Sequence, residues 1–260
     1  MRSGTATAPA GALVGGRVRD PTAVGIALKQ LLARNDITET RALVAANDAV
    51  ATFRVLRYPA AASDAEVDSA IARELPLDPS RMATRWVEVP QSHDLREVYV
   101  ASWDRAEVKN IVDATKLAGL DPSVVELKST CVARAVTEPS CVVLDLSAEP
   151  MDATLIDHCV PQVWHNFHAD ITQDDNVAAA LAAPLRSVLR FYKSRRDTEY
   201  GPHCPVLITG EHVLPTHVVA RLSELVDHPV QPLPMPARVP ADIRHTTYLT
   251  CLGLVMRRTR

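Results

Sequence analysis

Asp145 is the residue of this sequence whose type and position most directly suggest chemistry. It closes an apolar run over 141–144, and an acidic, turn-forming break then leads into a second apolar run that contains Thr154. This pattern predicts a β-hairpin with a carboxylate at the end of a buried strand, where a phosphate or a metal-bound water could be held. The alternative is structural, because a carboxylate at a strand end can also simply close a turn.

Other polar groups give weaker indications of a site. His165 and His168 lie three residues apart on a predicted strand, which directs them to opposite faces and disfavours a metal site. Arg186, Arg190 and Lys193 share one face of a predicted helix, either as a solvated face or as a surface for an anionic partner or lipid. The sequence lacks GxSxG, HExxH, GxxxxGK[ST] and GxGxxG. The common hydrolase, zinc-protease, P-loop and Rossmann signatures are therefore missing, and no catalytic set converges.

Composition limits the classes of protein to consider. The chain has 260 residues, of which 47% are hydrophobic and 23% charged, enough for one large domain or two smaller ones. Its net charge of -3 disfavours a nucleic-acid partner. The 5 cysteines are scattered without a CxxC pair, which suits a reducing compartment. Because no run approaches the roughly 18 apolar residues of a membrane span, and because the N-terminus lacks a signal-peptide core, we expect a cytoplasmic chain.

Hydrophobic periodicity predicts a mixed order of strands and helices. After a flexible entry over 1–20, the expected elements of the first half are a helix from Pro21, strands at 41–46 and 51–58, a helix opened by a capping box of Ser63 and Glu66, strands at 82–89 and 97–102, and a helix ending at Gly119. Those of the second half are strands at 141–147, 152–157 and 160–168, a helix over 173–196 with a possible break at Pro184, a strand over 205–209, a helix over 214–226, an extended Pro-rich connection over 229–240, and a helix over 243–256. Several strands precede each helix, so an α+β or mixed α/β architecture fits better than strict alternation.

Five passages, in this order, carry a resemblance to a known family. They are AGLDPSVVELKS over 118–129, the hairpin over 142–154, LRFY over 189–192, VLITG over 206–210 and LGLV over 252–255. Together they resemble the PilM family, the cytoplasmic actin-like proteins of the type IV pilus assembly platform, which are similar to the cell-division protein FtsA. None of the passages is specific alone, and the resemblance rests on their order and spacing.

The resemblance implies an actin-like, ribonuclease H-like fold of two domains. Residues 1–50 would be the remnant of the first actin-like subdomain, 51–118 an inserted SHS2-like subdomain of the FtsA and PilM type, 119–140 a connection, and 141–260 the second actin-like domain. Members of the family begin with a strand and an Asp-x-Gly-Ser/Thr turn that form the first phosphate loop. Because 11–32 already resembles the region after that loop, we expect the fold to be N-terminally incomplete.

The same resemblance assigns the nucleotide-binding positions to Asp145, Ser147, Thr154 and Gly210. Ser147 stands where the family has a glycine, and Glu211 follows Gly210 where the family has a second glycine. Each lost hydrogen bond to a phosphate is worth about 1.5–3 kcal/mol, so losing two or three weakens binding roughly a thousandfold or more. We therefore expect ATP and Mg²⁺ to bind weakly or not at all, and we expect no other cofactor or metal.

Two functions from different classes follow from the resemblance. The first is a non-catalytic pilus scaffold at the inner-membrane platform, which binds a cytoplasmic peptide of a membrane-anchored PilN-like protein and connects it to the pilus motor ATPase. Its groove would be lined by parts of 41–58 and 97–130, with the apolar residues Phe53, Val55, Leu56, Val98 and Val100. The second is an active actin-like ATPase or sugar-kinase-superfamily enzyme, which would need the first phosphate loop. An open edge on the strand over 41–46 would also favour self-association.

Overall fold

The computed structural model describes residues 2–75, 77–89, 95–147, 150–171, 174–196, 200–236, 239 and 243–257. The chain divides into two compact units, residues 1–127 and 128–260. The division falls between a strand that ends at Leu127 and a helix that begins at Lys128. The predicted domain boundaries at residues 50, 118 and 140 stay predictions.

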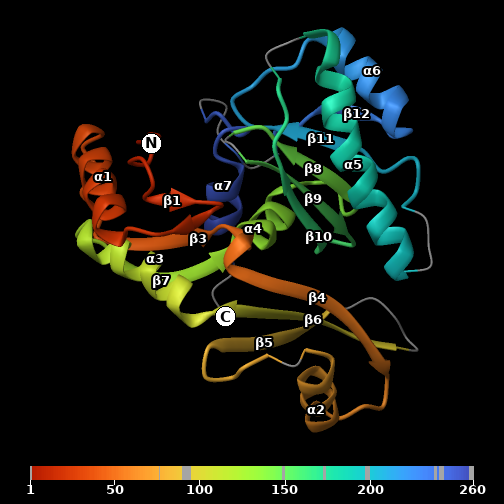
Figure 1. The fold of residues 1–260 in the computed structure, drawn as a ribbon, viewed down its shortest axis with the longest axis horizontal. Helices are drawn as coiled ribbons and strands as arrows, with labels where there is room; N and C mark the ends of the chain where they lie inside the picture. Colours follow the sequence, from red (N-terminus) through yellow and green to blue (C-terminus); the bar gives the residue numbers. More distant parts are fainter. Residues whose placement is uncertain are drawn as a thin grey trace. The chain divides into compact units, whose positions relative to one another are not determined.

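Unit 1 contains a small layer of two helices and a parallel strand pair (Figure 1). Its elements are the hairpin β1 (Leu13–Val14) and β2 (Arg17–Val18), the helices α1 (Pro21–Arg34) and α3 (Arg105–Leu117), and the parallel strands β3 (Arg41–Ala46) and β7 (Asp121–Leu127). Asp20 and Asp104 cap the two helices by accepting hydrogen bonds from backbone amides of the first turn. At Gly25 the helices approach so closely that a Cβ atom would lie 2.8 Å from the carbonyl oxygen of Ala114.

The hairpin of β1 and β2 was not predicted, because residues 1–20 were expected to be a flexible entry. Gly15 and Gly16 both have positive φ, 55° and 76°. This is the backbone conformation that a two-residue hairpin turn needs. The pair of adjacent glycines was therefore a usable signal for the hairpin.

The rest of unit 1 is a three-stranded antiparallel sheet covered by one helix (Figure 1). The strands are β4 (Ala51–Pro59), β5 (Met82–Val89) and β6 (Leu95–Asp104), in the order β4-β6-β5, with a short 3-10 turn η1 (Asp48–Val50) before β4. The helix α2 (Asp64–Glu74) opens with the predicted capping box of Ser63 and Glu66. Its buried residues Val67 and Ile71 pack against Val98 and Val100 of β6.

Unit 2 is a five-stranded sheet between two pairs of helices (Figure 1). Its elements are α4 (Lys128–Ala135), β8 (Cys141–Asp145), β9 (Met151–Asp157), β10 (Val160–Phe167), α5 (Asp174–Arg196), β11 (Val206–Thr209), α6 (Thr216–Val226), β12 (Val230–Pro232) and α7 (Leu249–Val255). The strand order is β10-β9-β8-β11-β12, in which the predicted meander is antiparallel and β11 runs parallel to β8 and β12.

Alternate residues of β8 face the two helical layers of unit 2. Val142 and Leu144 pack with α5 and α6 in one cluster, whereas Cys141 and Val143 pack with α4 and α7 in another. Asp145 follows the second alternation and therefore faces the α4 side. The sheet thus positions the predicted carboxylate beneath the start of α4.

Two helices of unit 2 differ from the predicted ones. The break considered possible at Pro184 does not occur, since α5 runs continuously from Asp174 to Arg196 with this proline inside it. The last helix begins only at Leu249 rather than at 243. The reason is local. The carbonyl oxygen of Thr246 accepts hydrogen bonds from the Thr209 hydroxyl and the Gly210 amide, at 2.6 Å and 3.1 Å, so this part of the chain is bonded to the end of β11.

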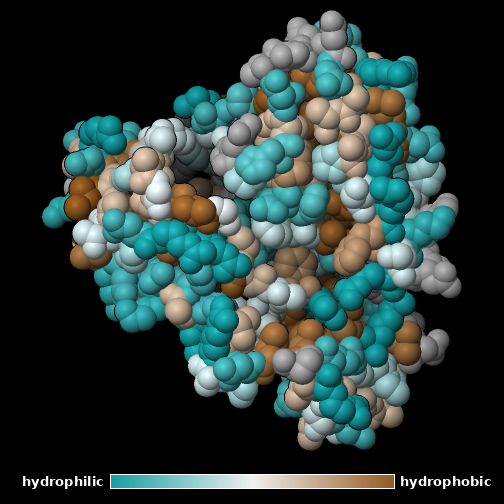
Figure 2. Space-filling model, viewed as in Figure 1, coloured by the Kyte–Doolittle hydropathy of each residue, from teal (hydrophilic) through white to brown (hydrophobic). Residues whose placement is uncertain are grey.

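No helix of the described ranges is long and apolar enough to cross a membrane. Figure 2 shows hydrophilic and apolar side chains interspersed over the visible face of the molecule.

Candidate functional site

The candidate site lies at the carboxyl ends of β8 and β11, under the first residue of α4. In the sheet register, Asp145 is the pairing partner of Asp152 on β9 and of Thr209 on β11. The ammonium group of Lys128 lies 2.7 Å from Asp145 Oδ2 and 2.6 Å from Asp152 Oδ2. The three side chains are 20%, 12% and 7% exposed, in the order Lys128, Asp145, Asp152. One lysine therefore bridges two largely buried carboxylates, and we call this set the Lys128 cluster.

The turn that follows β8 is hydrogen-bonded to the side chain of Asp145. The backbone amide of Ser147 donates a hydrogen bond of 2.9 Å to Asp145 Oδ1, and the Ser147 hydroxyl donates to the same oxygen. Of the four predicted nucleotide-binding residues, the structure thus brings Asp145 and Ser147 into direct contact. The donors of this turn, which would have to face a phosphate, point to the chain's own carboxylate.

Gly210 belongs to the same place, because it lets the end of β11 approach the end of β8. It has a φ of 111°, and a Cβ atom built there would lie 2.6 Å from the carbonyl carbon of Leu146 and from the amide nitrogen of Ser147. Thr154, the fourth predicted residue, is 2% exposed and lies on β9 two positions after Asp152, on the same face of the strand. All four predicted residues therefore surround one end of the sheet.

The charges of the Lys128 cluster determine which carboxyl group keeps its proton. Burial alone would raise the pKa of Asp145, but the charge of Lys128 and hydrogen bonds from Lys128 and Ser147 outweigh burial and lower that pKa. Burial also raises the pKa of Asp152, which Lys128 offsets only in part and the charge of Asp145 reinforces. Burial opposes the charge on Lys128, yet the two carboxylates raise its pKa above the ordinary value. Lys128 and Asp145 therefore form the ionised pair, and Asp152 is the carboxyl that takes up a proton first.

The predicted partner-binding residues divide between the two faces of the β4-β6-β5 sheet. Val98 and Val100 are 0% exposed and lie under α2, and Leu56 packs against the same cluster. Phe53 and Val55 occupy the alternate positions of β4 and therefore lie on the opposite face. There Phe53 contacts Tyr99 of β6, with 5.6 Å between the ring centroids. The sequence prediction had placed all five residues in one groove, whereas the structure puts three of them under α2 and two on the other face.

Comparison with known proteins supports a fold for this chain. No family model matches the sequence, and no curated protein matches it. The structure is similar to that of the PilM-PilN type IV pilus biogenesis complex, with a TM-score of 0.71 and 18% sequence identity, over 95% of this chain and 88% of that chain. This chain has the fold of PilM.

Two further solved structures are more distant from this PilM fold. They are the cytoplasmic domain of EpsL, an inner-membrane component of the type II secretion system of Vibrio cholerae, and the ethanolamine utilization protein EutJ from Carboxydothermus hydrogenoformans. Each has a TM-score of 0.49 and 12% identity. The EpsL match covers 90% of this chain and 82% of that one, and the EutJ match covers 94% and 77%. The actin-like fold predicted from the sequence is confirmed by the PilM match.

The family resemblance in the sequence implies a nucleotide with Mg²⁺ at the carboxyl end of β8, and the residues present there do not fit that group. The two carboxylates that could approach a metal are already bridged by the Lys128 ammonium. The Ser147 amide is bonded to Asp145, so it is not directed toward a phosphate. Within the described ranges, no group of three or more His, Cys, Asp or Glu side chains could hold a metal ion. The site is internally satisfied, with a cation and an anion supplied by the chain itself.

Sequence reasoning missed Lys128 and Asp152. The burial of Lys128, whose side chain is 20% exposed, is known only from the structure and has no local signal in the sequence. Buried lysines are rare unless they are paired. Once its burial is known, this lysine therefore indicates that acidic partners lie elsewhere in the sequence.

Proposed function

We propose that this chain is a non-catalytic scaffold of type IV pilus biogenesis, which binds an extended cytoplasmic peptide of a membrane-anchored protein of the PilN type. The observation that carries the proposal is the similarity of its fold to PilM in the PilM-PilN complex over 95% of the chain. In this role the chain works on the cytoplasmic side of the inner-membrane platform and is held there by its partners, among them the pilus motor ATPase.

The Lys128 cluster supports a function without efficient ATP hydrolysis. A phosphoryl-transfer site needs positively charged groups and backbone amides directed at the phosphates. Here the amide of Ser147 and the ammonium of Lys128 are both directed at Asp145. Converting this end of the sheet to a nucleotide site would first require breaking a buried ion pair, which costs several kcal/mol.

The peptide would bind to unit 1, at β4 and the sheet face that α2 leaves uncovered. β4 pairs only with β6 among the described strands, so its other edge can accept an extended chain by main-chain pairing. The face beside it carries Phe53 and Val55, which are half-buried, and Tyr99, which is 8% exposed. Val87 of β5, on the same face, is 60% exposed. A strand edge without a partner among the described strands, next to apolar side chains, is the arrangement that captures an extended peptide.

The test is a binding titration with the N-terminal cytoplasmic peptide of a PilN-type membrane protein. We expect Phe53→Asp to abolish or strongly weaken capture, because it places a charge at the centre of the apolar face. The matched control is Phe191→Asp, which makes the same change at a 49% exposed phenylalanine of α5. Equal capture by wild type and Phe53→Asp would place the peptide site elsewhere. A wild type that does not bind the peptide would contradict the scaffold proposal.

A further inference from the structure

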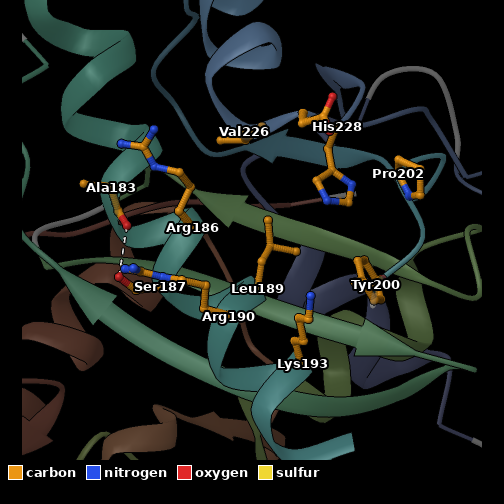
Figure 3. A pocket seen from close by; sticks show the side chains of 11 residues that line it. Ala183, Arg186, Ser187, Leu189, Arg190, Lys193, Tyr200, Pro202, Val226 and His228 are labelled. Atoms are coloured by element: carbon orange, nitrogen blue, oxygen red, sulfur yellow. Dashed lines mark hydrogen bonds between the residues drawn. The ribbon is translucent and has the colours of Figure 1, made fainter. Parts of the chain in front are cut away.

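A second surface, in unit 2, has a chemistry that the proposed scaffold role does not use. Three cationic residues of α5, Arg186, Arg190 and Lys193, line a cavity of about 640 Å³. Figure 3 shows their side chains coming from one helix, with His228 opposite them, from the segment between α6 and β12. We call this hollow the α5 cavity.

The α5 cavity has a rigid apolar floor beside its cationic rim. Leu189, Tyr200 and Val226 line it together with the cations. Tyr200 is fixed because its hydroxyl donates a hydrogen bond of 2.5 Å to the carbonyl oxygen of Ile156. His228 is fixed by a contact of 3.0 Å between its Nδ1 atom and the carbonyl oxygen of Cys204. Because a carbonyl oxygen only accepts, Nδ1 carries a hydrogen in this arrangement.

The positive charge of the α5 cavity is only partly compensated. Asp227 is the acidic residue among those lining it. In the part of the chain that the structure describes, neither Arg186 nor Arg190 has a carboxylate within salt-bridge distance. Arg186 makes only a long contact of 3.4 Å to the carbonyl oxygen of Leu225. Two guanidinium groups beside an apolar hollow are suited to carboxylates or phosphates, since guanidinium donors match the geometry of both.

We propose that the α5 cavity binds an extended acidic peptide segment of a partner protein. The spacing of the cations favours this ligand. On a helix that rises 1.5 Å per residue, Arg190 lies about 6 Å along the axis from Arg186. Carboxylates on alternate residues of an extended strand lie about 6.6 Å apart. A single phosphate group cannot span such a row, and a flat membrane surface does not enter a recessed apolar floor.

This second docking site is independent of the peptide site proposed on β4, because it lies in the other unit and uses charge instead of main-chain pairing. Its binding should weaken steeply with salt, since the cations are exposed and screened. Capture on the apolar face of β4 should depend on salt much less. The two sites can therefore be separated by ionic strength as well as by substitution.

The test is fluorescence anisotropy of the full chain with a labelled peptide in which glutamate alternates with alanine, against the same peptide with glutamine at every glutamate. We expect the glutamate peptide to bind more tightly, and Arg186→Gln combined with Arg190→Gln to weaken it ~10-fold or more, because two charge-assisted contacts are lost. The matched control is Arg221→Gln combined with Arg244→Gln, which removes the same charge from exposed positions outside the cavity. We expect this control to bind like wild type.

Several outcomes would overturn the proposal. Equal binding of the glutamate and glutamine peptides would show that the ligand need not be acidic. Equal binding by the cavity double variant and wild type would show that the peptide does not bind in the α5 cavity. Two further arms test other anions, namely inorganic phosphate as a competitor and vesicles of phosphatidylserine and phosphatidylcholine. Full displacement of the peptide by low phosphate concentrations would show a phosphate site instead. Arginine-dependent binding of the vesicles without binding of the peptide would show a membrane surface.

Discussion

Two regions of the molecule differ in whether their groups already have partners within the chain. One is the carboxyl end of β8 and β11 in unit 2, and the other is the β4-β6-β5 sheet in unit 1. In unit 2 the lysine, two carboxylates and the amide of Ser147 bind one another. In unit 1 one edge of β4 lacks a partner strand among those described, and Val87 is exposed on the face opposite α2. Groups that are already paired within the chain have little to offer a ligand, whereas unpaired edges and exposed apolar faces do. This difference favours unit 1 as the place for the proposed PilN-type peptide, and it disfavours a nucleotide at the end of the unit 2 sheet.

The largest expected effect is on the Lys128 cluster itself. Lys128→Met should destabilise the chain by about 3–5 kcal/mol, because it leaves two buried carboxylates without their cation. Urea unfolding measures the change. Lys109→Met is the matched control, since Lys109 forms only an exposed pair with Asp113 within α3, and such pairs contribute about 0.3–0.5 kcal/mol. Equal stability of the two variants would show that the cluster is not the closed site described here.

Replacing each of the two carboxylates by asparagine should destabilise the fold by a different amount, and this difference should depend on pH. The folded-state pKa of Asp145 is lowered, so its pair with Lys128 stabilises the fold above the unfolded pKa of aspartate, and this stability is lost as pH falls through the folded value. Asp145→Asn should therefore cost about 1–3 kcal/mol at neutral pH and progressively less in acid. Asp152 has a raised pKa, so its folded state favours the proton and Asp152→Asn should cost less at neutral pH.

The measurement is urea unfolding of both asparagine variants at several pH values from neutral to acid. The difference in stability between the two variants should be widest at neutral pH and should close on acidification. If Asp152→Asn were the more damaging change at neutral pH, the roles of the two carboxylates would be reversed.

A smaller effect is expected at the other open edge of unit 1. β3 pairs only with β7 among the described strands, and Leu43 of β3 is 43% exposed. Such an edge favours pairing between copies, and a lysine on it opposes pairing. We expect the wild type to self-associate in light scattering and Leu43→Lys to shift it toward monomer. Leu117→Lys, which adds the same charge at a 51% exposed leucine of α3, should have no such effect. A wild type that stays monomeric at all concentrations would show that the edge of β3 does not cause self-association.

The smallest expected effect is that of a nucleotide on the thermal stability of the chain. Mg-ATP should leave the thermal unfolding temperature unchanged, because a ligand stabilises a fold only when its concentration approaches or exceeds its dissociation constant. Calorimetry provides a second measurement. Binding in the low micromolar range would show that the Lys128 cluster opens to admit the nucleotide.

Local patterns in the sequence predicted the elements that depend on local chemistry. The capping box of Ser63 and Glu66 marked α2, and the apolar run with Asp145 at its end marked β8 and its hairpin. What was missed depends on contacts between distant residues. β7 pairs in parallel with β3 about eighty residues earlier in the chain, a pairing for which local periodicity gives no signal. Likewise Lys128 meets Asp145 and Asp152 only because β8 pairs with β9 under α4.

The most direct test of the central claim is the affinity of the PilN-type peptide measured with and without Mg-ATP. A scaffold whose nucleotide site is closed by its own lysine has no means of coupling peptide binding to nucleotide. We therefore predict the same dissociation constant under both conditions, for wild type and for the Phe191→Asp control. A change of ~10-fold or more on adding Mg-ATP would contradict the account, because it would require a nucleotide to bind this chain and to favour one of its conformations.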